Sequence, residues 1–572
     1  MARYTNIYPG QDGEITLRVR WLGTRTSERD DAFRGKYANA MSLRQSDAVP
    51  FTVNSPADAI DAHPGDGICA TPAGTCTLRA ALQEANALEG LDLIAIPAGT
   101  YSLAITGSDE DMAVSGDLDI VDHVALQGDG PEQTVLDGQG HNRLFHVHRG
   151  SHAVLQGLTL QHGVAMDGGA LRNDGRVALH DTHIRQNEGV GNALGEAGGG
   201  LYNNLGATMV VVNSNIIHNR AGRDETAAAC DGGGIYNRGS ARLTDVTIGH
   251  NTAGIQDGVS LSCRGGGGGI LNRGQLELLD THIHHNVASE IAGGLASVGG
   301  VVDMRHSTVA DNQSTAGAGG LGLVGTTATI FESIIARNAS NGAAGGGIDN
   351  DRGSTLTITH STIRDNTVAD IAAIGSGGGI HNHLSQLTVS RSTFRRNTAA
   401  GSGGGLMNVA GLTTISDSTF SENMAQGLTA SEGDSGAVWT SFVLRMVNTT
   451  ISANRAHRDG GGIDGPVELV NSIVAGNMAG RGGPDCHGGV LSAGHNLVED
   501  PSGCANALQE RDLTGNAGLG AYTDEGSPGG GHYPLLPNSR AIDAAEEAVC
   551  SSIDQLALPR RDGCDIGAVE FF

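Results

Sequence analysis

The sequence predicts an all-β protein, a right-handed parallel β-helix (solenoid) with an N-terminal helical cap and a C-terminal disulfide-bearing cap. Three observations predict it: an internal repeat, a high glycine content and a scarcity of aromatic residues. Of the 572 residues, 89 are glycine, only 14 are proline, and aromatic residues make up 3%. A compact core in a chain of this length normally depends on large aromatic side chains. The interior must therefore consist of small and β-branched residues in many thin layers.

A two-part motif recurs between residues 168 and 480. The first part is a glycine cluster followed by an aliphatic residue, any residue and often Asn, as in GGGLYN ending at Asn203. The second part is Ser or Thr, any residue, Ile, Val or Phe, two more residues and Asn. Its final asparagines, spaced 23 to 35 residues apart, are Asn187, Asn219, Asn251, Asn286, Asn312, Asn338, Asn366, Asn397, Asn423, Asn454 and Asn477.

The repeat favours coils of short strands over helices. Runs such as VELVNSIV alternate with a period of two, and Gly and Asn interrupt them. Helical repeats keep a stricter period, whereas a β-coil tolerates corner loops of variable length. We expect a stack of about twelve to fourteen coils.

The row of asparagines and the row of glycine clusters both have structural explanations. We expect each motif-ending asparagine to take the left-handed conformation of a sharp corner and to join its neighbours in an amide ladder. We expect the glycines to lie where closely packed coils leave no room for a Cβ atom.

The eight cysteines fall into neighbouring pairs along the chain. Sequential disulfides are the simplest arrangement and indicate an oxidising compartment. Buried free thiols in a cytosolic protein are the alternative, and zinc is disfavoured because no CxxC pair is present. The predicted disulfides are Cys69–Cys76, Cys230–Cys263, Cys486–Cys504 and Cys550–Cys564.

The bulk charge and the hydropathy limit the partners. A net charge of −27 repels phosphate backbones, so we expect no nucleic-acid partner. No cofactor is evident, although so many carboxylates can hold calcium. No apolar stretch is long enough for a transmembrane helix. Residues 1–50 are polar and lack the apolar core of a signal peptide. Either the start is processed or mis-assigned, or export uses another route.

The two ends of the predicted solenoid resemble known bacterial domains. Residues 51–87, with the signature CTLRAA (Cys76 to Ala81), resemble the CSLREA domain, and residues 532–570 are similar to the choice-of-anchor Q domain. The resemblance implies an exported bacterial surface or secreted protein. We therefore divide the chain into a polar segment that we expect to be disordered (1–50), a CSLREA-like cap (51–110), β-helix coils (111–480) and a choice-of-anchor Q-like cap (481–572).

Catalytic side chains of β-helix enzymes lie on outward strand faces, so we searched for outward polar rows. The residue six positions before each ladder asparagine forms one row, in which Asp245 and Asp280 should repel each other or share a cation. A second patch, Asp349, Asp351, His381 and His383, has the residue types for acid–base work or metal ligation. The full first row is Asp181, Asn213, Asp245, Asp280, His306, Glu332, His360, Arg391 and Asp417.

Other polar groups point less directly to a site. The histidine group His282, His284 and His285 is predicted not to converge, because strand alternation separates the side chains. Arg364, Arg395 and Arg396 are close enough in register to be considered as the basic residues of a lyase-type site. Tyr202 and Tyr236 are the only tyrosine pair in matching outward register. Two long corner insertions, residues 221–234 and 253–269, are the preferred hypothetical site for a glycan or a cell-surface partner, since loops on a rigid scaffold often carry binding.

Two functions remain open at this point. The leading hypothesis is a surface or secreted protein with a structural, adhesive or glycan-binding role and no catalysis. The alternative is a polysaccharide-degrading or -modifying enzyme: a lyase, hydrolase or epimerase. A fold of this kind hosts both, and the oligomeric state is left open.

Overall fold

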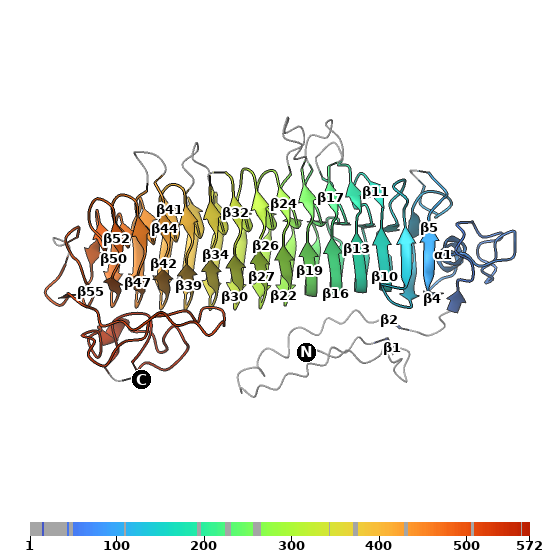
Figure 1. Cartoon of the computed structure of the whole chain (residues 1–572). Helices are drawn as coiled ribbons and strands as arrows, with labels where there is room; N and C mark the ends of the chain where they lie inside the picture. Colours follow the sequence, from blue (N-terminus) through green and yellow to red (C-terminus); the bar gives the residue numbers. More distant parts are fainter. Residues whose placement is uncertain are drawn as a thin grey trace.

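The chain winds into a long parallel β-solenoid, which Figure 1 shows side-on as a rod of stacked coils. The computed structural model describes residues 50–107, 110–191, 196–222, 230–254, 265–342, 344–369, 376–427, 433–504, 508–561 and 563–571. It also describes the backbone of two short antiparallel strands, β1 (Glu14–Ile15) and β2 (Leu43–Arg44). The predicted fold class is confirmed. The rest of the polar segment 1–50 lies outside the described residues.

Three parallel sheets run the length of the rod. Sheet 2, which has one strand per coil, contains 14 strands, in agreement with the predicted coil number. These are β6 (Leu118–Ile120), β9 (Phe145–Val147), β12 (Leu171–Asn173), β15 (Leu201–Asn203), β18 (Ile235–Asn237), β21 (Ile270–Asn272), β25 (Leu295–Val298), β29 (Leu321–Val324), β33 (Ile348–Asp351), β37 (Ile380–His383), β41 (Leu406–Val409), β45 (Val438–Thr440), β49 (Ile463–Asp464) and β53 (Cys486–His487).

Sheet 3 is narrow and consists of 12 two-residue strands. They are β11 (Val164–Ala165), β14 (Glu188–Gly189), β17 (Arg220–Ala221), β20 (Thr252–Ala253), β24 (Val287–Ala288), β28 (Gln313–Ser314), β32 (Ala339–Ser340), β36 (Thr367–Val368), β40 (Thr398–Ala399), β44 (Met424–Ala425), β48 (Arg455–Ala456) and β52 (Met478–Ala479).

Sheet 1 is the widest sheet, and each coil bends once where it crosses this sheet. Middle coils contribute one ten-residue strand, such as β19 (Ser240–Gly249). Later coils contribute two, such as β22 (Gln275–Leu279) with β23 (His282–His284), and β30 (Thr327–Phe331) with β31 (Ile334–Ala336). The bend lies at the predicted outward row: Asp245 and Asp280 have φ values of 56° and 50°. Strand alternation is interrupted there because a left-handed residue turns the chain.

The asparagine ladder is confirmed, but its predicted backbone conformation is wrong. From Asn187 to Asn454, each side-chain Nδ2 donates to the Oδ1 of the next ladder asparagine at 2.9 to 3.1 Å. The left-handed residue is the one before the asparagine, such as Gln186 (φ 55°) or His218 (φ 57°). The ladder amides are buried in the wall of the coil, so the solvent-facing neighbour takes the corner conformation.

The glycine clusters lie where the prediction places them, at the tightest contacts between coils. A Cβ atom on Gly347 would lie 2.6 Å from the carbonyl oxygen of Gly379 on the next coil. Such a distance is well inside van der Waals contact, so a larger residue would push the coils apart.

The predicted N-terminal helix is α1 (Leu78–Ala87), at the start of the rod (Figure 1). The side chain of Thr77 caps it by accepting from the amide of Ala80 at 3.1 Å. Arg79 from the CTLRAA signature is 1% exposed. Its guanidinium pairs with Asp58 at 2.6 Å and donates to the carbonyl of Gly116. These two contacts connect the helix to chain segments that precede and follow it. The function of the helix as a cap stays a prediction.

Three of the predicted disulfides are present: Cys69–Cys76, Cys486–Cys504 and Cys550–Cys564. Cys230 is also disulfide-bonded. Its predicted partner Cys263, like residues 223–229 and 255–264 of the two corner insertions, lies outside the described residues.

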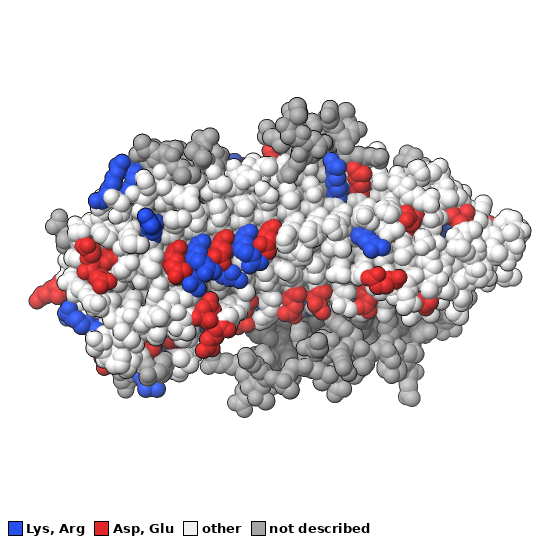
Figure 2. Space-filling view, viewed as in Figure 1, with Lys and Arg blue, Asp and Glu red and all other residues white. Residues whose placement is uncertain are grey.

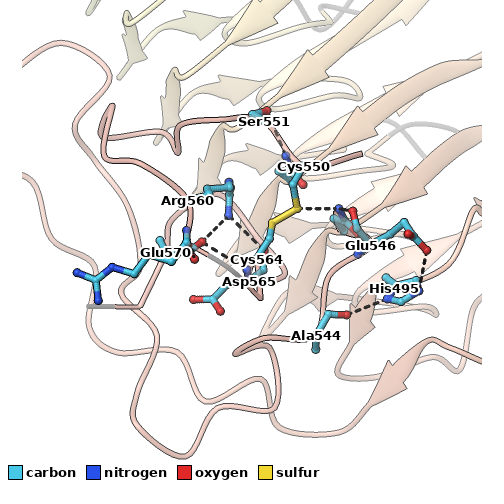
Figure 3. Close-up of a disulfide and its surroundings, with 12 residues drawn as sticks. His495, Ala544, Glu546, Cys550, Ser551, Arg560, Cys564, Asp565 and Glu570 are labelled. Carbon is cyan, nitrogen blue, oxygen red and sulfur yellow. Dashed lines mark hydrogen bonds and ion pairs between the residues drawn. A yellow bond between two sulfur atoms is a disulfide. The ribbon is translucent and has the colours of Figure 1, made fainter. Parts of the chain in front are cut away.

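The C-terminal part of the chain runs back along the flank of the rod (Figure 1). Its backbone and side chains bind a row of outward threonines on sheet 1: Gly529 N donates to Thr362 Oγ1, and Thr419 Oγ1 donates to Gln555. Figure 3 shows the Cys550–Cys564 disulfide of this segment beside the Arg560–Glu570 ion pair of 3.2 Å. This part of sheet 1 is therefore covered.

Among the described residues, no helix has the length and apolarity that crossing a membrane requires.

The last rung of the ladder should make stability depend on pH. Asn477 donates to Asp485 Oδ1 at 2.9 Å, and burial raises the pKa of this carboxyl group to about 6. Between about pH 4 and pH 6 the folded state keeps a proton that the unfolded state loses, so stability falls as the pH rises, by up to about 3 kcal/mol.

Urea unfolding across this window measures the effect. The Asp485→Asn variant should lose this part of the pH slope, whereas Glu525→Gln, at an exposed carboxylate, should keep it. Equal slopes in wild type and Asp485→Asn would contradict the assignment.

Candidate functional site

A row of polar and aromatic side chains runs along the outside of sheet 2 in its C-terminal half. Its members occupy the same position on six successive strands, β33 to β53, and all are partly exposed. We call it the Trp439 row. It consists of Asp349, His381, Met407, Trp439, Asp464 and His487.

The repeat itself places these side chains. The position between the aliphatic residue and the asparagine of the first motif faces outward, because its two neighbours are buried on the core side. In-register stacking brings the same position of each coil to within about 4.8 Å of the next. Residues far apart in sequence thus form one continuous line.

Two Asp–His pairs flank the aromatic residue of the row. His381 Nδ1 lies 2.8 Å from Asp349 Oδ1, and His487 Nδ1 lies 3.1 Å from Asp464 Oδ1. An imidazole that donates from Nδ1 to a carboxylate keeps Nε2 free to accept a proton or a hydroxyl hydrogen bond. Each pair can therefore orient a hydroxyl group and exchange a proton with it.

The predicted patch of Asp349, Asp351, His381 and His383 is brought together. The second pair, His383 Nδ1 with Asp351 Oδ1, is also 2.8 Å apart, and the two imidazole rings are stacked with centroids 5.9 Å apart. The four side chains form a two-by-two block on adjacent strands β33 and β37. Their role in binding or catalysis stays a prediction.

The residues that the prediction missed are Met407, Trp439, Asp464 and His487. Their signal is in the repeat: the outward position of GGGLMN is Met407, that of SGAVWT is Trp439, and that of GGGIDG is Asp464. These later copies of the motif are weaker, and before His487 the glycine cluster is reduced to Gly482 and Gly483, followed by Pro484 and Asp485.

The surroundings of the row are acidic near its C-terminal end. Burial raises the pKa of Asp464, and the negative charges of Asp434 and Asp459 act in the same direction, whereas His487 lowers it. Asp434 lies 3.6 Å from Arg458. A carboxyl group with a raised pKa is a suitable hydrogen-bond partner and proton donor for a neutral polar ligand.

The other predicted row, at the bend of sheet 1, does not join this site. Burial is the main cause of a raised pKa at Asp280, and Asp245 on the preceding coil adds to it. Repulsion within this pair was predicted, but burial outweighs it. Asp417 of the same row is buried under the C-terminal segment, where Ser551 donates to it at 2.6 Å.

The predicted arginines are engaged in ion pairs on sheet 1. Arg364 and Arg396 both pair with Asp365 at 2.7 Å, and Arg395 pairs with Glu422 at 2.9 Å. All three arginines are thus held in ion pairs, two of them with the same carboxylate, and none belongs to the Trp439 row.

The tyrosine pair is stacked but closed to ligands. Tyr202 and Tyr236 lie in register with ring centroids 5.3 Å apart, yet they are only 2% and 1% exposed. Both hydroxyls reach Glu196, and burial raises the pKa of Tyr202 to about 12. Their outward position was predicted, but both rings belong to a buried apolar cluster that also contains Leu271 and Ala296, so neither ring has a face exposed to a sugar.

The prediction that His282, His284 and His285 do not converge is wrong. Residues two apart share a face, and the rings of His282 and His284 are 4.5 Å apart. His285 has a φ of 52°, and this left-handed turn brings its ring beside that of His284. Two groups of described residues have a geometry that could hold a metal ion: His250 with His284 and His285, and Asp111 with Asp119, His146 and His148.

No family model and no curated protein sequence matches the chain, so the resemblance to the CSLREA and choice-of-anchor Q domains stays a prediction. Similar solved structures include the pectate lyase Pel9A, at 11% identity over 92% of this chain and 97% of that chain, with a TM-score of 0.29. The catalytic unit of a GH87 α-1,3-glucanase from Streptomyces thermodiastaticus is 15% identical over 78% and 71%, with a TM-score of 0.30. A mannuronic acid-specific polysaccharide family 6 lyase from human gut microbiota is 10% identical over 76% and 88%, with a TM-score of 0.33.

Proposed function

We propose that the protein binds a polysaccharide along the Trp439 row. The observation that carries this proposal is the position of Trp439, partly exposed and in register between two Asp–His pairs. Sugars offer an apolar face to an indole ring and hydroxyl groups to carboxylates and imidazoles. The row supplies both kinds of contact in one straight line.

The dimensions of the row suit a chain-like ligand. Six positions at about 4.8 Å span about 24 Å, which is enough for several consecutive sugars. The coils are rigid because each is bonded to its neighbours, so little side-chain and backbone ordering is required on binding. A small ligand would use only part of this line, whereas an extended polysaccharide uses all of it.

An extracellular location supports the same proposal. Cys69–Cys76, Cys486–Cys504 and Cys550–Cys564 are bonded, and disulfides of this kind persist in oxidising compartments. Polysaccharides of cell surfaces and of the surrounding matrix are found in these compartments. We propose that the protein acts outside the cell, at a surface or after secretion.

A second candidate function is chemistry on the same polysaccharide. It is favoured by the block of Asp349, Asp351, His381 and His383, in which each carboxylate orients an imidazole. An oriented imidazole is the usual form of a general base. Hydrolysis, lyase elimination and epimerisation each need such a base, and the block lies at one end of the row where a sugar would pass.

Binding is tested by affinity electrophoresis and calorimetry of the disulfide-intact protein against a panel of neutral and acidic polysaccharides. Trp439→Ala should weaken binding to the best ligand about tenfold or more, because an aromatic contact of this kind contributes about 0.5 to 1.5 kcal/mol beyond its buried area. Phe331→Ala, which removes a partly exposed aromatic side chain from sheet 1, is the matched control and should bind as wild type. Equal affinities of the Trp439 and Phe331 variants would contradict the proposed row.

The same panel separates binding from catalysis. Release of reducing ends or unsaturated uronates by wild type, abolished with binding retained in His383→Ala, which changes the block but not the Trp439 row, would establish the enzymatic alternative. Binding without any change in the polymer would support the binding function alone.

A further inference from the structure

Three histidines on neighbouring coils converge at the edge of sheet 1. His250 comes directly after β19, His284 ends β23 and His285 follows it. His284 Nδ1 and His285 Nδ1 are 3.0 Å apart. The rings of His250 and His285 are stacked with centroids 5.0 Å apart, and one ring nitrogen of each of the three residues lies within 4.8 Å of the others.

A glycine makes this convergence possible. Gly249 pairs in register with His284 on the next coil. A Cβ atom at Gly249 would lie 2.7 Å from His284 Cε1 and 2.8 Å from its Nε2. The imidazole of His284 therefore occupies the space that a side chain on the preceding coil would fill, and it lies across the coil boundary toward His250.

An imidazole binds a metal ion in its neutral form, through the lone pair of the ring nitrogen that carries no proton. Each of the three residues places one ring nitrogen close to those of the other two, so each can supply one ligand atom.

We propose that His250, His284 and His285 form a site for a transition-metal ion of the Zn²⁺, Ni²⁺ or Cu²⁺ class. With metal–nitrogen bonds of about 2.0 to 2.1 Å, two ligand nitrogens on one ion lie about 2.9 to 3.4 Å apart. The separation of 3.0 Å between His284 Nδ1 and His285 Nδ1 fits this range, and a ring nitrogen of His250 lies within 4.8 Å of a ring nitrogen of each. An all-imidazole set selects these ions over Ca²⁺ and Mg²⁺, which prefer oxygen.

The position of the site indicates what the ion does. The row that contains His250 and His285 continues over the next coils as Asp311, Arg337, Asp365 and Arg396, where Arg337 pairs with Asp311 and Arg396 with Asp365, each at 2.7 Å. A line of alternating red and blue on the face in Figure 2 corresponds to this pattern. These ion pairs join adjacent coils on the outside of the rod. A metal held by His250 on one coil and by His284 and His285 on the next joins the preceding coils in the same way and leaves coordination positions open to solvent.

The experiment uses untagged full-length protein stripped with a chelator at pH 7.5. Zn²⁺ binding is measured by calorimetry, and Co²⁺ is used as an optical probe of a nitrogen ligand set. Because Asp119, His146 and His148 could take up a second ion, the readout is the difference between wild type and variants, not the total stoichiometry. The expected result is one fewer bound ion in the His284→Ala/His285→Ala protein, with a rise of Tm on Zn²⁺ addition that this variant lacks.

Two further variants make the test specific. His218→Ala removes an exposed imidazole that stacks on His250 with centroids 4.9 Å apart but lies outside the group of three, and it should bind as wild type. Gly249→Ala keeps all three imidazoles and displaces the ring of His284, so it should weaken binding at this site at least tenfold. If wild type and the double variant bind the same number of ions, or if Ca²⁺ competes equally with Zn²⁺, the site is overturned and the three rings are joined only by the hydrogen bond between His284 and His285.

Discussion

The rest of this structure depends on the hydrogen bonds between identical asparagine side chains on successive coils. At Asn338, for example, Nδ2 donates to Asn366 Oδ1 at 3.0 Å and to the carbonyl of Val309 at 2.9 Å, and Oδ1 accepts from the backbone and side chain of Asn312. The amide can meet all of these partners only when the coils are in register. The ladder thus satisfies buried polar groups at the corner and sets the alignment of every strand beside it.

Because the coils are in register, a position that recurs in the sequence repeat forms a continuous row of side chains on the surface. Each residue of the repeat lies next to the equivalent residues of the preceding and the following coil. The neighbouring copies of the motif therefore determine which side chains it contacts. This explains the Trp439 row on sheet 2, the histidine cluster, and the ion pairs that run from Asp311 to Arg396. The C-terminal segment covers outward threonines of sheet 1, such as Thr393, whereas the Trp439 row remains partly exposed.

Much of the fold could be predicted from the sequence because it repeats. Eleven asparagines and the glycine clusters predict the stack of coils, and neighbouring cysteines predict the three disulfides that the described residues contain. The backbone conformation of single residues was harder to predict. The left-handed residue is His218, not Asn219, because the side-chain amide of Asn219 must face the wall of the coil. The burial of Tyr202 and the convergence of His284 with His285 depend on packing from other coils and on a corner turn, which strand alternation alone does not describe.

The most direct test of this account is the free energy of unfolding of Asn338→Ala compared with Asn341→Ala on the same coil, measured by urea denaturation. Asn338 is buried within the ladder, whereas Asn341 is exposed. The ladder predicts a loss of about 3 kcal/mol or more for Asn338→Ala, since the partners on both neighbouring coils are left unsatisfied, and a change within about 0.5 kcal/mol for Asn341→Ala. Equal stability of the two variants would contradict the claim that the asparagine ladder holds the coils in register.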